Sequence, residues 1–138
     1  MRPLSPLLVA LLLALPLAAR AGDICTALTE GDVAAAVGTE LKRSPTDPCR
    51  FGRGLSSVSI TMHAGGASHF DEYASQARQQ FPGTQPVAGV GSKAIFYGFN
   101  LAVQYKSDLF VVNMFLGKSA SDKIALSKAV ALKVISHL

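Results

Sequence analysis

Residues 93–117 read KAIFYGFNLAVQYKSDLFVVNMFLG and decide the class of fold. The stretch is rich in aromatic and β-branched side chains, which strands favour. Turn residues interrupt it at Gly98 to Asn100 and again at Ser107 and Asp108. Three runs of strand length remain, and we therefore predict three consecutive antiparallel strands.

The last of these runs carries apolar residues on both of its faces. Side chains alternate along a strand, so one set comprises Leu109, Val111, Asn113 and Phe115, and the other comprises Phe110, Val112, Met114 and Leu116. One set is expected to pack against helices. For the other set two alternatives stand: the loop from Pro82 to Ser92 buries it, or it forms a binding surface.

The loop that precedes this stretch resembles a nucleotide-binding fingerprint. Residues 87–96, VAGVGSKAIF, place Gly89, Gly91 and Ala94 in the pattern G-x-G-x-x-A, with Lys93 inside it. Such a fingerprint needs a buried strand before it and a helix after it. Here a Pro-rich segment precedes and a strand follows, so we expect no nucleotide and no other cofactor. Instead Gly89 and Gly91 should form an exposed turn at which Lys93 meets an anionic partner.

Two further strands are expected upstream. Residues 57–63, SVSITMH, alternate strictly between polar and apolar side chains, which predicts an antiparallel strand with one wet face. The segment Cys49 to Arg53 ends in turn residues and should pair with it as a hairpin. Lys42 to Pro48 contains two prolines and is expected to be a surface connection.

Three helices complete the pattern. Thr29 and Asp32 form a capping box, and Gly38 ends that helix. Ser68 is expected to cap a second helix whose apolar stripe comprises Phe70, Tyr73, Ala74, Ala77 and Phe81. Ser119 or Ser121 should cap a third, which offers Ile124, Val130, Val134, Ile135 and Leu138 to the core.

The order of elements is therefore α-β-β-α-β-β-β-α. It predicts an α+β fold in which helices pack on one face of an antiparallel sheet of about five strands. Residues 22–138 have the size of a single domain with one core.

The N-terminal residues 1–21 have the layout of a cleaved signal peptide, with an early arginine, an apolar run and an A-x-A site before Gly22. A signal anchor is the alternative, but the run is shorter than a membrane span requires. Cys25 does not follow a lipobox, and no later segment is apolar enough to span a membrane. We therefore expect a periplasmic or secreted protein.

Cys25 and Cys49 are the two cysteines of the chain. In an oxidising compartment an even number of cysteines predicts a disulfide rather than a catalytic thiol.

The charge balance argues against nucleic acid as a partner. Without Arg2 and Arg20, 11 basic residues face nine acidic ones, whereas nucleic-acid-binding domains concentrate basic residues on one face. Lys42, Arg43, Arg50 and Arg53 lie close together in sequence, but Glu40 and Asp47 lie among them. We interpret this segment as a solvated surface of mixed charge.

Catalytic residues are not expected. No G-x-S-x-G elbow occurs, and the capping role of Ser68 explains its place beside His69. His63 and His69 flank Gly65 and Gly66, and with Asp71 or Glu72 they would provide three metal ligands, which is the minimum for zinc. A metal-binding protein or metal-dependent enzyme is therefore the alternative from another class.

The runs CTALTEGDVAAAVG, PCRFG and VAGVGSKAIF resemble those of the DUF3558-like small exported bacterial proteins, many of which are lipoproteins. Proteins of that kind are of unknown function, and the resemblance supplies no established catalytic residues for this chain. From the small size, the predicted export and the lack of catalytic motifs we expect an exported interaction protein that binds a protein or an envelope-derived ligand. A periplasmic inhibitor or immunity protein against an envelope hydrolase is a specific alternative.

Overall fold

The computed structural model describes residues 21–138, so the predicted signal peptide lies outside the described residues except for Ala21. Helices and strands follow one another in this order: α2 (Ala21–Ala27), α3 (Glu30–Val37), β1 (Lys42–Arg43), β2 (Arg50–Arg53), β3 (Ser56–His63), the 3-10 helix η1 (Gly66–His69), α4 (Phe70–Gln80), β4 (Gln85–Pro86), β5 (Lys93–Tyr97), β6 (Asn100–Tyr105), β7 (Asp108–Phe115) and α5 (Ala120–Ser136). No helix among these residues is long and apolar enough to cross a membrane.

The strands form one antiparallel sheet in the order β1-β2-β3-β7-β6-β5-β4. The predicted α+β class and antiparallel sheet are confirmed, and so is the meander β5–β7. The predicted number of about five strands is wrong, and so is the predicted order of elements. The two additional strands, β1 and β4, are two residues long and lie in segments that we predicted to be loops.

These short strands form because each loop runs beside the outer strand of the sheet. Lys42 pairs with Gly52 at one margin, and Gln85 pairs with Phe96 at the other. Pro86 has no N–H to donate to a neighbouring strand. Proline is tolerated in β4 because an outer strand needs partners on one side only. An additional helix, α2, also precedes α3.

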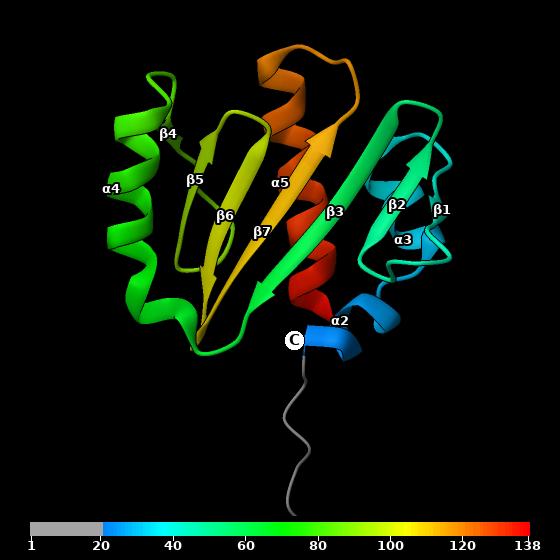
Figure 1. Ribbon diagram of the computed structural model, residues 1–138, viewed down its shortest axis with the longest axis horizontal. Coiled ribbons are helices and arrows are strands. Elements are labelled where there is room, and N and C mark those ends of the chain that lie inside the picture. The colour runs from blue at the N-terminus through cyan, green and yellow to red at the C-terminus, as the bar shows by residue number, and fades with distance from the viewer. Residues whose placement is uncertain (1–20) are drawn as a thin grey trace, which may run out of the picture.

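The central pair β3–β7 joins the two halves of the chain. Its register runs through seven residue pairs, from Ser57 opposite Phe115 to His63 opposite Leu109. The register places Val58, Ile60 and Met62 on the same face as Met114, Val112 and Phe110. This first face is covered by α2, α3 and α5, and Figure 1 shows α3 and α5 behind the sheet.

The second face is covered by α4 over part of its width. Phe70, Ala74 and Ala77 of this helix belong to a second apolar cluster with Ala102 and Leu109 of the sheet. The prediction that helices pack on one face only is therefore wrong. The apolar half of the second face is buried by α4 and not by the loop from residue 82 to residue 92.

The beginning of α4 also differs from the prediction. Ser68 does not cap the helix, because it lies within η1, and His69 occupies the cap position without a side-chain hydrogen bond. A side chain at Gly66 would approach Leu109 Cβ to 3.2 Å. Gln104 Nε2 donates to the Ala67 carbonyl at 2.7 Å. The 3-10 helix thus closes tightly onto the β6–β7 end of the sheet before α4 starts.

The other predicted caps are present. Asp32 N donates to Thr29 Oγ1 at 2.9 Å and Thr29 N donates to an Asp32 carboxylate oxygen at 3.0 Å, which completes the capping box. Gly38 ends α3 with a φ of 72°, in the left-handed region that glycine adopts without strain. Ser119 caps α5 by accepting from Asp122 N.

The predicted disulfide between Cys25 and Cys49 is confirmed. It fastens α2 to the residue before β2, and Cys25 is buried. The bond therefore attaches the first helix to the sheet across a separation of 24 residues.

Replacing both cysteines by serine should lower the free energy of unfolding by about 3–4 kcal/mol, because the unfolded chain regains the entropy of an open loop of this size. Urea unfolding of the oxidised protein and of the double variant measures the difference. Adding a reductant should destabilise the wild-type protein and leave the variant unchanged. Equal midpoints for the two oxidised proteins would contradict the prediction.

The end of α5 is tied to the start of α3. His137 Nε2 lies 3.1 Å from Asp32 Oδ2. The backbone N–H of Thr29 and then His137 hold the pKa of Asp32 below its ordinary value of 3.8, since both favour the ionised carboxylate. The pKa of Asp32 is lower in the folded protein than in the unfolded chain, so the ionised carboxylate stabilises the folded state above pH 3.8. This stabilisation is lost as the pH falls through the pKa of the folded state.

Asp32→Asn should therefore lower the free energy of unfolding at neutral pH, and the difference from the wild type should shrink as the pH falls below 3.8. Urea unfolding across a pH series measures this difference. The matched control is Glu72→Gln, which removes an exposed helix carboxylate 4.0 Å from His69. A difference for Asp32→Asn that stays constant with pH would count against the linkage.

Candidate binding site

Half of the second sheet face has no helix over it. It extends over β2, β3 and the C-terminal end of β7, beyond the reach of α4 (Figure 1). Polar residues occupy it: Arg50, Ser57, Ser59, Thr61, His63 and Asn113. We call this surface the open half-face. The strict alternation of residues 57–63 predicted its wet strand.

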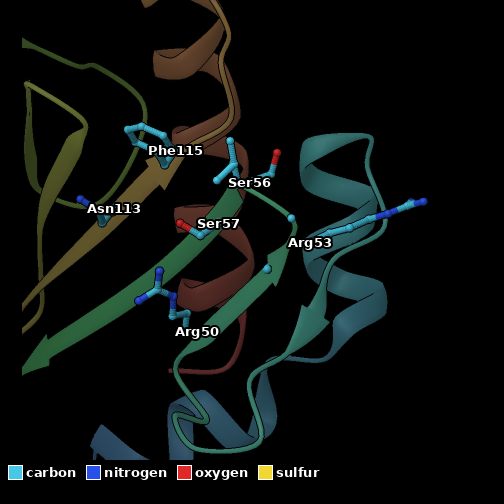
Figure 2. A pocket seen from close by; sticks show the side chains of 9 residues that line it. Arg50, Arg53, Ser56, Ser57, Asn113 and Phe115 are labelled. Atoms are coloured by element: carbon cyan, nitrogen blue, oxygen red, sulfur yellow. The ribbon is translucent and has the colours of Figure 1, made fainter.

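At the upper end of the open half-face lies a hollow of about 550 Å³. Its lining includes Arg50, Ser57 and Asn113 as polar groups, and Leu55 and Phe115 as apolar ones. The hollow therefore combines hydrogen-bonding groups with apolar ones, and Figure 2 shows Arg50, Ser57, Asn113 and Phe115 around it.

Two arginines border the hollow, but only one faces it. Arg50 pairs with Ser59 and so projects from the second face, whereas Arg53 pairs with Ser56 and projects from the first. Figure 2 shows the Arg50 side chain on the open side and the Arg53 side chain directed away from it. Lys42 first, and Arg53 to a smaller extent, lower the pKa of Glu40, which places the Arg53 charge near that acid.

Arg50 has no carboxylate within 4.0 Å among the described residues. The neighbouring Ser57, Ser59 and Asn113 are uncharged. Its guanidinium thus presents donors in a planar fork, an arrangement that matches a carboxylate or a peptide carbonyl.

A pair of asparagines adjoins the hollow. Asn113 Nδ2 donates to Asn100 Oδ1 at 2.8 Å, between neighbouring strands. This bond orients the Asn113 side chain and leaves its carbonyl oxygen without a protein donor within residues 21–138. Arg50 donors and an Asn113 acceptor therefore lie on one surface, which suits recognition of a polypeptide backbone.

The open half-face lacks the arrangement that nucleophilic catalysis requires. Within residues 21–138, no hydrogen bond links Ser57, Ser59 or Thr61 to His63. A hydroxyl nucleophile needs such a base within hydrogen-bond reach. The hydroxyl groups of β3 are thus not linked to this histidine.

The glycine loop lies elsewhere. Gly89 and Gly91 have φ values of 80° and 61°, as a tight turn requires, but Val90 between them is 2 % exposed and belongs to the core. The loop delivers β5 into the sheet as predicted, and Ser92 N donates to the Gln104 carbonyl at 2.8 Å.

Lys93 is also remote from the hollow. Its Nζ lies 3.0 Å from Asp71 Oδ1, and β3, β7 and β6 separate its strand from β2. The three candidates Gly89, Gly91 and Lys93 therefore do not meet Arg50 in one site.

The two histidines considered as metal ligands lie at the lower end of the molecule. His63 ends β3, and His69 ends η1 with its Nδ1 4.0 Å from Glu72. No group of three or more His, Cys, Asp or Glu residues that could hold a metal ion occurs in the part of the chain that the structure describes. The described residues thus do not supply the third ligand that this hypothesis needs.

Arg50 is the residue that the sequence did not single out. It lay in a basic segment that we interpreted as a mixed surface, and the structure divides that segment. Lys42 pairs with Glu40 at 2.9 Å, and Arg43 lies over the Phe51 ring, 5.2 Å from its centroid. The sequence did contain a signal for Arg50. Pairing the predicted hairpin so that Arg50 lies opposite Ser59 places Arg50 on the polar face of the sheet.

Comparison of the chain with protein-family models, with curated proteins and with solved structures gives no match. The resemblance to DUF3558-like proteins stays a prediction.

The glycine loop can be tested for a packing role. A Cβ at Gly91 would lie 2.6 Å from Val103 Cγ1 and would also clash with the Gln104 carbonyl. Gly91→Ala should therefore lower the free energy of unfolding by about 2 kcal/mol or more.

The matched control is Gly83→Ala, where a Cβ meets nothing within 4 Å. This variant should stay within about 1 kcal/mol of the wild type. Equal urea midpoints for the two variants would show that Gly91 is not required for packing.

Proposed function

We propose that this protein is an exported, non-enzymatic binding protein that contacts a protein partner through the open half-face around Arg50. The observation that supports this most directly is the bare half of a sheet face whose other half is buried by α4. It contains an arginine without a carboxylate partner, next to an exposed phenylalanine.

The composition of the surface favours a protein partner. Arginine and aromatic residues are enriched at the centres of protein interfaces, and polar rims surround them. Arg50 and Phe115 border the same hollow, and the serines of β3 continue it along the sheet. A small apolar ligand would instead need a concave site lined mainly by apolar side chains.

The disulfide supports the exported location. Such bonds persist in oxidising compartments and are rare in the cytosol. The Cys25–Cys49 bond, together with the predicted leader, favours a periplasmic or secreted protein. An inhibitor or immunity protein against an envelope hydrolase is a specific form of this proposal.

A site-specific cross-linking experiment tests the proposed surface. A photoreactive residue at Ser57 lies in the hollow, and the same residue at the exposed Gln79 of α4 is the control. In cells that export the protein, we expect Ser57 to give a discrete cross-linked species that Gln79 does not give.

A matched pair of charge reversals then tests the role of Arg50. Arg50→Glu should reduce the cross-link at Ser57 about tenfold, because an unpaired guanidinium at an interface contributes more than 1 kcal/mol. Arg53→Glu, on the opposite face of the same strand, should leave it nearly unchanged. Equal yields at Ser57 and Gln79, or equal effects of the two reversals, would contradict the proposal.

A further inference from the structure

Large exposed apolar side chains gather at one end of the molecule. Five such residues occur in the described part of the chain, and four of them lie at the same end of the sheet: Leu55, Phe81, Phe99 and Phe115. We call these four residues the apolar end. Leu132 of α5 is the fifth. Isolated exposed apolar residues are ordinary, whereas a group of them marks an interaction site.

The topology brings these four residues together. Leu55 lies in the turn between β2 and β3, and Phe99 lies in the turn between β5 and β6. Phe115 ends β7 opposite Ser57, and Phe81 follows α4 directly. Figure 1 shows these two turns and the ends of β7 and α4 along the top of the sheet.

The side chains form a row. The ring centroids of Phe99 and Phe115 lie 5.3 Å apart, and those of Phe81 and Tyr97 also lie 5.3 Å apart. Leu55 borders the same hollow as Phe115. Leu55 is 91 % exposed although it is one of the most apolar residue types. Leu55 and Phe99 project from turns at this end of the sheet, whereas Phe115 lines the hollow beside Leu55 and Phe81 lines a smaller one at the end of α4.

Cationic groups accompany the row. Lys123 Nζ lies 4.5 Å from the centre of the Phe99 ring, and Lys118 is exposed in the segment that follows β7. Arg53 precedes the turn that carries Leu55.

The acids at this end are fewer than the cations. Asp122 accepts a hydrogen bond from the neutral Ser119 hydroxyl at 2.8 Å within the cap of α5, and Glu40 pairs with Lys42 at 2.9 Å. Because Arg53, Lys118 and Lys123 outnumber Asp122, the apolar end carries a net positive charge.

From this combination we infer that the apolar end docks on an anionic lipid surface, with Leu55 and Phe99 inserted at the boundary between headgroups and acyl chains. Apolar side chains at projecting tips with a cationic surround suit the interface of a bilayer. Phenylalanine and leucine are among the side chains that interfacial segments bury at this depth, and each lysine or arginine near an anionic surface adds to the attraction. The apolar end shares Leu55 and Phe115 with the hollow of the open half-face, whereas Phe81 and Phe99 lie outside that hollow. Docking on a lipid surface needs no protein partner.

Vesicle sedimentation tests the inference. The probe is residues 22–138, which contain the whole sheet, both apolar clusters and the disulfide. We expect it to sediment with vesicles of phosphatidylcholine and phosphatidylglycerol in equal parts, and at least tenfold less with phosphatidylcholine alone. Added salt should release it, because salt screens exposed charges.

The double variant Leu55→Asp and Phe99→Asp should bind the anionic vesicles at least tenfold more weakly. Leu132→Asp is the matched control, since Leu132 is 45 % exposed and lies about 18 Å along α5 from its first residue. It should bind as the wild type does. Unchanged urea midpoints establish that all variants are folded.

Two outcomes would overturn the inference: a wild-type protein that binds neither vesicle, or a double variant that binds as the wild type does. A photoreactive residue at Leu55 that yields a protein cross-link while vesicles are not bound would assign the apolar end to a protein partner instead. Because the Ser57 and Arg50 experiments use no vesicles, failure of the lipid inference is distinguishable from failure of the proposed function.

Discussion

The pairing of β3 with β7 is the contact on which the rest of the structure depends. It joins a hairpin from the first half of the chain to a meander from the second half through seven residue pairs. Because side chains alternate along paired strands, this one register decides which residues of the whole sheet face α5 and which face the opposite side. A shift of one residue would turn Phe110 and Val112 away from the core and turn Asn113 into it.

Much of the fold was predictable because its determinants are local. The capping box at Thr29 involves residues three apart, and the alternation at residues 57–63 spans one strand. The position of α4 was not predictable in the same way. Its apolar stripe indicated a helix, but only the strand order decides that it covers the second face of β5 to β7 and leaves β3 bare. The two-residue strands β1 and β4 likewise arise from proximity to a neighbour and not from their own composition.

The candidate site shows the same division. The serines of β3 were expected on a wet face, and they are there. The hairpin register places Arg50 on the open face of the sheet and Arg53, only three residues later, on the opposite face. The apolar end was least accessible to sequence reasoning, because Leu55 and Phe115 are sixty residues apart in the chain and would each pass for an ordinary core residue.

The shortness of β1 and β4 affects how the protein associates with other copies at high concentration. A sheet grows by adding strands at its margins, and each margin here offers only two residues, one of which in β4 is a proline. A second copy that pairs with the outer strand has too few free backbone N–H and C=O groups to extend the sheet. Natural sheets use such short outer strands to resist polymerisation. The exposed row of apolar side chains lies at the strand ends, where no ladder can form. High local concentration therefore does not favour fibre growth through the sheet.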